Sequence, residues 1–104
     1  MFTRNVTMHL KPNRVKQYTE TLEKKVIPML RNQKGFKDEI SFVNRAGTEA
    51  TGISMWNSKE DADAYDRTDY KKVITALADV ITGTPEIKTG EVTNSTPHAF
   101  KTQG

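Results

Sequence analysis

The sequence predicts a single α+β domain whose elements follow the order β-α-β-β-α-β. Two kinds of hydrophobic periodicity support this fold class. In some segments apolar residues alternate, which is typical of strands, and in others they recur every three or four residues, which is typical of helices. The 104 residues suffice for one domain with a modest core. We expect that domain to span residues 1–96 and residues 97–104 to form a C-terminal tail.

The first ten residues predict a strand, followed by a helix. One face of the strand carries Phe2, Arg4, Val6, Met8 and Leu10, and the other carries Thr3, Asn5, Thr7 and His9. From Arg14 the period changes, and the apolar stripe of a helix is formed by Val15, Tyr18, Leu22, Val26 and Met29. Asn13 can cap this helix, Pro28 predicts a kink because it cannot donate a backbone hydrogen bond to Lys24, and Gly35 is the expected stop.

A β-hairpin is expected next. Its strands cover residues 36–44 and 49–56, with a turn at 45–48. In the first strand Ile40 and Phe42 share one side, and Val43 lies on the other. In the second strand Ile53 and Met55 lie opposite Ser54 and Trp56.

The second helical region can be capped by Asn57 with Glu60 or by Ser58 with Asp61, and the first pair matches the capping-box pattern. Its apolar rhythm slips at residues 67–69, so we expect two helical segments with a bend. Residues 82–85 contain glycine and proline and should close the helix, and residues 86–96 predict the last strand.

Composition excludes several classes of function. The chain has no cysteine, which excludes disulfides, thiolate metal sites and cysteine nucleophiles. His9 and His98 are far apart and have no acid at ligand spacing, so no metal site is predicted. The net charge of +3 is small and the basic cluster is not interleaved with aromatics, so we expect no nucleic-acid partner. Without a membrane-length apolar run or a secretory signal, a soluble cytoplasmic protein is expected.

The predicted order of elements is that of the ferredoxin-like fold, with four antiparallel strands and both helices on one face of the sheet. The second face of such a sheet remains uncovered. Whichever side of the first strand meets the helices, part of the other side needs covering, because an exposed apolar sheet face would associate. We therefore predict a homodimer.

Three segments of this chain resemble the antibiotic biosynthesis monooxygenase domain family. Trp56-Asn57-Ser58-Lys59-Glu60, followed by Ala62 and Tyr65, resembles the family's W-x-S-x-E…A…aromatic signature. Residues 26–30 and 33–36 are similar to the end of the family's first helix and its entry into the second strand. The resemblance covers roughly residues 2 to 95 and implies the dimeric α+β barrel fold.

The family includes cofactor-independent oxygenases of phenolic polyketides, quinol oxidases and haem-degrading enzymes, so each site residue is transferred separately. For haem degradation, Asn5 matches the family's asparagine, but Tyr65 and Thr75 stand where a tryptophan and a histidine are needed. With no histidine on the second helix, haem has no axial ligand there. For polyketide oxidation, Trp56 matches, whereas Gly52 and Ala62 replace the asparagine and the tyrosine.

The first hypothesis is therefore an oxygenase or oxidase that uses no cofactor and acts on a small aromatic phenol, quinol or polyketide-like substrate. Trp56, Tyr70 and Thr7 would contact the substrate. Asn5 would hold its oxygen, His9 would accept the proton and Tyr65 would contribute its phenol. The second hypothesis is a dimer of the same fold that binds a ligand or is purely structural. The aromatics would then serve core packing, and His9 would be solvated or lie at the dimer seam.

Overall fold

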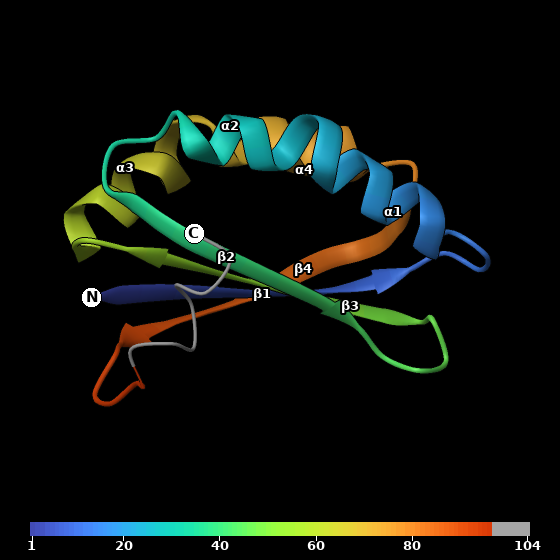
Figure 1. The fold of residues 1–104 in the computed structure, drawn as a ribbon. Coiled ribbons are helices and arrows are strands. Elements are labelled where there is room, and N and C mark those ends of the chain that lie inside the picture. The colour runs from blue at the N-terminus through green and yellow to red at the C-terminus, as the bar shows by residue number, and fades with distance from the viewer. Residues whose placement is uncertain (97–104) are drawn as a thin grey trace.

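The computed structural model describes residues 1–96 and confirms the predicted β-α-β-β-α-β order. Four antiparallel strands form one sheet in the order β2-β3-β1-β4, and all helices lie on one of its faces (Figure 1). The strands are β1 (Phe2–Leu10), β2 (Phe36–Val43), β3 (Glu49–Trp56) and β4 (Ile81–Glu91). The helical segments are α1 (Val15–Thr21), η1 (Leu22–Val26), α2 (Ile27–Arg31), α3 (Lys59–Thr68) and α4 (Tyr70–Leu77). The expected C-terminal tail, with His98, lies outside the described residues.

Strand alternation decides which side chains meet the helices. The even-numbered residues of β1 and β3 face the helices, and the odd-numbered residues of β1 point to the opposite side, called here the outer face of the sheet. Trp56, at the end of β3, is fully buried under the helices. The central part of the sheet thus has an apolar inner layer, which forms the core with the buried faces of the helices.

The first helical region accommodates Pro28 by a change of helix type. The five residues of η1 form a π-helical turn between α1 and α2. Pro28 has no amide hydrogen to donate to the carbonyl of Lys24, and its ring crowds that carbonyl, so a wider turn just before it removes the conflict. The expected irregularity is present, but Asn13 is not the cap. Asn13 adopts a left-handed φ of 61°, and Arg14 takes the N-cap position without a side-chain cap hydrogen bond.

The hairpin and the divided second helical region agree with the sequence. β2 and β3 end within one residue of the predicted bounds, and Asp69 separates α3 from α4. Of the two candidate caps, the structure uses Ser58, whose side chain accepts a 3.2 Å hydrogen bond from the amide of Asp61. Gly35, at a φ of +80°, turns the chain beside Asp61, where a Cβ atom would overlap the aspartate side chain. This turn places the segment after α2 beside the first turn of α3.

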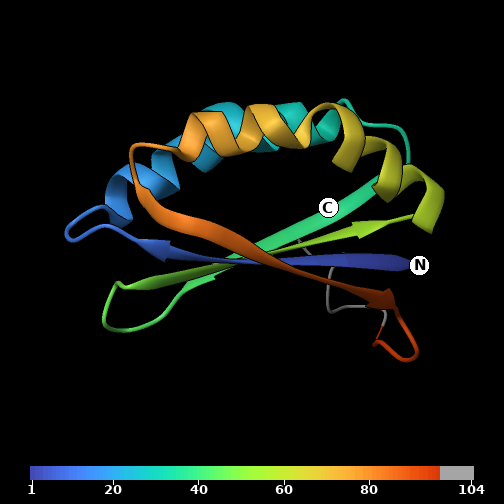
Figure 2. The ribbon, with the colours of Figure 1, turned by 180° about the vertical axis from the view of Figure 1, so that it is seen from behind.

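The last strand differs from the prediction. It starts at Ile81, five residues earlier than expected, and ends at Glu91. The glycine and proline between residues 82 and 85 do not break it because β4 is an edge strand, where a missing amide and a local irregularity are tolerated. Gly83 takes a left-handed φ of 69° near the register shift between Thr7 and His9. Figure 2 shows β4 rising from the sheet edge toward the end of α4.

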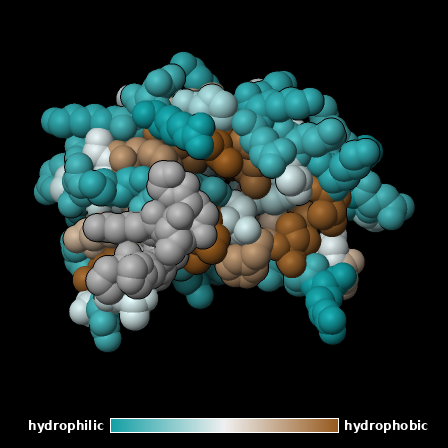
Figure 3. Space-filling model, in the orientation of Figure 1, coloured by the Kyte–Doolittle hydropathy of each residue, from teal (hydrophilic) through white to brown (hydrophobic). Residues whose placement is uncertain are grey.

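Beyond the core, the molecule exposes hydrophobic surface on the sheet. The side chains of Ile40 and Phe42, on the outer face of β2, are 44% and 55% exposed. Figure 3 shows a mostly hydrophilic surface over the helices and hydrophobic residues between the helices and along the strands below. Within residues 1–96, none of the helices combines the length and hydrophobicity that crossing a lipid bilayer requires.

Candidate functional site

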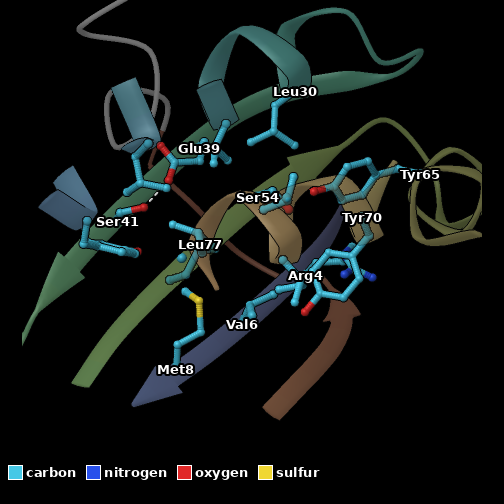
Figure 4. Close-up of a pocket in the computed structure, with 17 residues that line it drawn as sticks. Arg4, Val6, Met8, Leu30, Glu39, Ser41, Ser54, Tyr65, Tyr70 and Leu77 are labelled. Carbon is cyan, nitrogen blue, oxygen red and sulfur yellow. Dashed lines mark hydrogen bonds between the residues drawn. The ribbon is translucent and has the colours of Figure 1, made fainter. Parts of the chain in front are cut away.

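A pocket of about 60 Å³ lies between the inner face of the sheet and the helices (Figure 4). Its walls are mostly aliphatic, with leucines, valines and isoleucine from η1, α2 and α4 and with Val6 and Met8 from β1. Apart from Ser54, the polar residues in the lining form two groups. Arg4, Tyr65 and Tyr70 make up one group, called here the arginine end, and Glu39, Ser41 and Tyr18 make up the other, called here the glutamate end.

The arginine end is built around a buried guanidinium. The Arg4 side chain is only 4% exposed and points from β1 toward the helices. Its Nη1 donates a 2.8 Å hydrogen bond to Asp66 Oδ1 on α3. The guanidinium carbon lies 5.3 Å from the ring centroid of Tyr65 and 4.7 Å from that of Tyr70. These contacts hold the charge in place by an ion pair and two cation–π interactions, and they leave Nη2 buried without a partner among residues 1–96.

Tyr65 and Tyr70 extend this group into a chain of aromatic contacts. Tyr65 stacks on Trp56 with ring centroids 5.1 Å apart, and Tyr70 meets Tyr65 edge to face at 6.1 Å. Burial raises the pKa of Tyr65 above its ordinary value, although nearby Arg4 opposes the shift. Burial raises the pKa of Tyr70 in the same way. Both phenols therefore stay neutral at physiological pH and can act as hydrogen-bond donors.

The glutamate end carries a carboxylate and a second neutral phenol. Glu39 lies on the inner face of β2, where the hydroxyl of Ser41 donates a hydrogen bond to it. Burial raises the pKa of Glu39, and the bond from Ser41 works against that shift. Burial also raises the pKa of Tyr18 to about 12, with Glu39 adding to the shift. Ser41 is close enough to moderate the pKa of Tyr18, but Tyr18 Oη has no hydrogen bond of good geometry within the described residues.

Three buried polar atoms around one pocket therefore have no hydrogen-bond partner in residues 1–96: Arg4 Nη2, Tyr18 Oη and Tyr70 Oη. Leaving a buried donor unpaired costs about 1–3 kcal/mol. All three groups are donors, and the guanidinium is cationic. The pocket is suited to a ligand that presents oxygen acceptors on an otherwise apolar body.

The pocket is too small for an aromatic ring without movement of side chains. A cavity of roughly 150 Å³ accommodates benzene, and this one measures about 60 Å³. A second hollow of about 470 Å³ lies between α4 and β4 and is open to the surface. Tyr70 and Ile74 line both spaces. Displacement of these two side chains would join the groove to the pocket and admit a larger ligand.

The structure brings together only part of the predicted site. Tyr65 and Tyr70 line the pocket, as the substrate hypothesis requires. Trp56 does not border it; its ring lies behind Tyr65, and its Nε1 donates a 2.9 Å hydrogen bond to Ser54 Oγ.

Asn5, Thr7 and His9 lie on the outer face of β1, away from the helices, because the apolar residues of this strand turn inward. Of the two sides that the sequence left open for β1, the pocket takes the one with Arg4. Asn5 Oδ1 is nevertheless buried and has no hydrogen-bond partner within the described part of the chain.

Sequence reasoning missed Arg4, Tyr18, Glu39 and Ser41 as site residues. For Arg4 a signal exists, since it is the one charged residue on an otherwise apolar strand face and must find partners when that face is buried. Tyr18 lies on the apolar stripe of its helix, where it looks like a core residue. Glu39 and Ser41 carry no comparable signal, because their orientation depends on an irregularity in β2.

Fold and site together define a small ferredoxin-like α+β protein with a pocket between its sheet and its helices. Comparison with known proteins identifies solved structures that share this fold. No protein-family model matches the chain, and no curated protein does, whereas many solved structures share its fold.

One of them is a monooxygenase from the gene ActVA-Orf6 of Streptomyces coelicolor, in complex with nanaomycin D. It is 18% identical, with 91% of this chain and 89% of that chain covered and a TM-score of 0.76. SnoaB, a cofactor-independent oxygenase from Streptomyces nogalater, is 14% identical, with coverage of 92% and 96% and a TM-score of 0.74. A protein of unknown function from Nitrosomonas europaea is 12% identical, with coverage of 91% of each chain and a TM-score of 0.74. The chain shares its fold with these antibiotic biosynthesis monooxygenase structures, which confirms the ferredoxin-like fold predicted from the sequence.

Proposed function

We propose that this protein is a cofactor-independent oxidase or monooxygenase of the antibiotic biosynthesis monooxygenase family. Its substrate would be a small phenol, quinol or polyketide-like aromatic, bound between the sheet and the helices. The observation that carries the proposal is the set of three unpartnered buried donors around an apolar pocket. The two Streptomyces oxygenases of the same fold support it.

The chemistry needs no redox group from the protein. A hydroquinone that loses its hydroxyl protons can pass two electrons to dioxygen, yielding a quinone and hydrogen peroxide. The protein has to favour the anionic form of the substrate and keep water away from it. Arg4 supplies the positive charge, Tyr70 supplies a neutral hydroxyl donor, and the aliphatic walls supply the dry surroundings.

A homodimer is the assembly that we propose for this enzyme. The outer face of the sheet is left uncovered by the helices, and Ile40 and Phe42 are exposed there. Sheet-to-sheet contact between two copies would bury these side chains and produce the barrel that the family resemblance implies. Asn5, Thr7 and His9, on the same face, would then lie at the seam between the two copies rather than in the pocket.

The competing function is a dimer that binds a ligand without transforming it. Two observations favour it: the pocket is smaller than an aromatic ring requires, and the predicted proton acceptor, His9, lies on the outer face. For an oxidase, the small pocket requires that Tyr70 and Ile74 move to admit the substrate. The second requires a proton acceptor other than His9, on the inner face of the sheet.

Oxygen uptake by the pure protein distinguishes the two functions. A panel of hydroquinones, naphthohydroquinones and anthrones is mixed with protein in an oxygen electrode, with and without a chelator. We expect uptake above the spontaneous rate for at least one compound, insensitive to the chelator and reduced in Arg4→Met. Binding of a panel member without oxygen uptake would establish the non-catalytic function instead.

A further inference from the structure

An irregularity in β2 determines which carboxylate faces the pocket. Phe36 pairs with Trp56 and Asp38 pairs with Met55, so Lys37 is an extra residue in the ladder between β2 and β3. Without this bulge, alternation would turn Asp38 to the same side as Phe36. With it, Glu39 comes opposite Ser54 on the inner face, and Asp38 lies on the outer face. Bulges near active sites commonly redirect a side chain in this way.

The surroundings of Glu39 suit a proton acceptor. Leu22, Val26 and Leu30 border the same pocket and provide no charge. The titratable and charged groups that share the pocket with Glu39 are Tyr18 from α1, Tyr65 from α3, Tyr70 from α4 and Arg4 from β1. Burial raises the pKa of Glu39, which makes its carboxylate a stronger base than an exposed one.

Figure 4 shows Glu39 and Ser41 on one side of the pocket and Arg4 with Tyr70 on the other, with Ser54 and Leu77 between them. We infer that Glu39 is the residue that accepts the hydroxyl proton of an aromatic substrate lying between these two ends. The inference rests on the proposed function. The proton acceptor is thus a residue on β2. Ser41 positions the Glu39 carboxylate, and Tyr18 positions the substrate oxygen.

The step balances with dioxygen as the oxidant. The O–H bond of a hydroquinone breaks, its proton passes to the Glu39 carboxylate, and the electron pair stays on the phenolate oxygen. The phenolate transfers two electrons to dioxygen. Peroxide takes up the proton from Glu39 and the proton of the second hydroxyl, which leaves quinone, hydrogen peroxide and a deprotonated Glu39. Each cycle thus restores the base.

The test compares two isosteric variants, Glu39→Gln and Asp38→Asn, in the oxygen-uptake assay. Positioned proton acceptors contribute roughly 100- to 10,000-fold to a rate. We expect kcat to fall at least 100-fold in Glu39→Gln, and the acidic limb of its pH profile to disappear, with KM changed only a few fold. Asp38→Asn, whose side chain lies on the outer face one residue away, should keep the kcat and the pH profile of the wild type. Circular dichroism verifies that both variants fold.

A second readout follows the proton without turnover. The phenol and phenolate forms of 4-nitrophenol absorb at different wavelengths, so absorbance reports where its proton resides when it is bound. We expect two coupled titration steps in the wild type and in Asp38→Asn, and a single step in Glu39→Gln.

The two readouts separate the inference from the proposed function. Absence of oxygen uptake by the wild type, with two titration steps for bound nitrophenol, would refute the oxidase and support Glu39 as proton acceptor. A wild-type kcat and acidic limb in Glu39→Gln would overturn the inference while leaving the oxidase in place. Identical nitrophenol titrations in wild type and Glu39→Gln would overturn it as well.

Discussion

Replacing Arg4 by methionine should change the stability of the protein little and weaken its binding of an anionic ligand. The opposing contributions of Arg4 to stability nearly cancel. Its ion pair with Asp66 is worth at most about 1 kcal/mol, because the Asp66 side chain is 46% exposed and regains water when the pair is lost. Each cation–π contact contributes about 0.5–2 kcal/mol. Against these stands the unpartnered Nη2, with a penalty of about 1–3 kcal/mol, and the desolvation of the charge.

Methionine is unbranched like the aliphatic part of arginine, fills the space of that part and makes favourable sulfur contacts of about 0.3–1.5 kcal/mol with aromatic rings. We therefore expect the free energy of unfolding of Arg4→Met to lie within about 1 kcal/mol of the wild type. Binding should respond differently. A hydrogen bond to a charged group contributes about 1.5–3 kcal/mol, so the dissociation constant for a phenolate should rise roughly 10- to 150-fold.

Urea denaturation followed by tryptophan fluorescence measures the free energy of unfolding, since Trp56 is the only tryptophan and is fully buried. Titration with 4-nitrophenol above its pKa measures the dissociation constant for a phenolate. Lys59→Met serves as the control, because it removes an exposed cation whose ion pair with Asp63 lies on the helix surface. If the free energy of unfolding of Arg4→Met fell by more than about 3 kcal/mol while the folded fraction bound phenolate as tightly as the wild type, Arg4 would be a structural residue. That result would refute its role in ligand binding.

Two further predictions concern alkaline stability and assembly. The pKa of Tyr18 rises from 10.0 to about 12, so this residue contributes stability that is fully present below pH 10 and is lost as the pH rises to about 12. Between pH 10 and about pH 12, the free energy of unfolding measured by urea denaturation should fall less steeply for Tyr18→Phe than for the wild type, by about 1.4 kcal/mol per pH unit. Equal slopes for the two proteins would contradict this. If the proposed homodimer forms through the outer face of the sheet, Phe42→Lys should convert it to a monomer in light scattering, whereas Val15→Lys, on α1, should leave it a dimer.

Local sequence patterns predicted the elements well where packing and pattern agree. The alternation in β1, the apolar stripes of the helices and the hairpin turn lie where expected, because each reflects burial of one face of a regular element. The prediction failed at β4, where turn residues suggested a loop. Gly83 and Pro85 are tolerated within a strand only at a sheet edge, and the position of β4 at the edge follows from the strand order, which is a tertiary property.

The same division applies to the candidate site. Tyr65 and Tyr70 could be singled out because aromatics on a buried helix face need partners, and Arg4 carried a signal in the apolar face of its strand. Asn5, Thr7 and His9 formed an equally plausible polar face of β1. Only the packing of the helices on the opposite side decided that this face points outward.

The sequence by itself therefore determined the order of elements, the ferredoxin-like fold and the pool of aromatic residues, since these follow from periodicity along the chain. The tertiary structure alone decided which face of β1 meets the helices and which carboxylate of β2 enters the pocket. The physical reason is that strand side chains alternate, so a choice of face, or one inserted residue such as Lys37, reverses what every neighbouring side chain contacts.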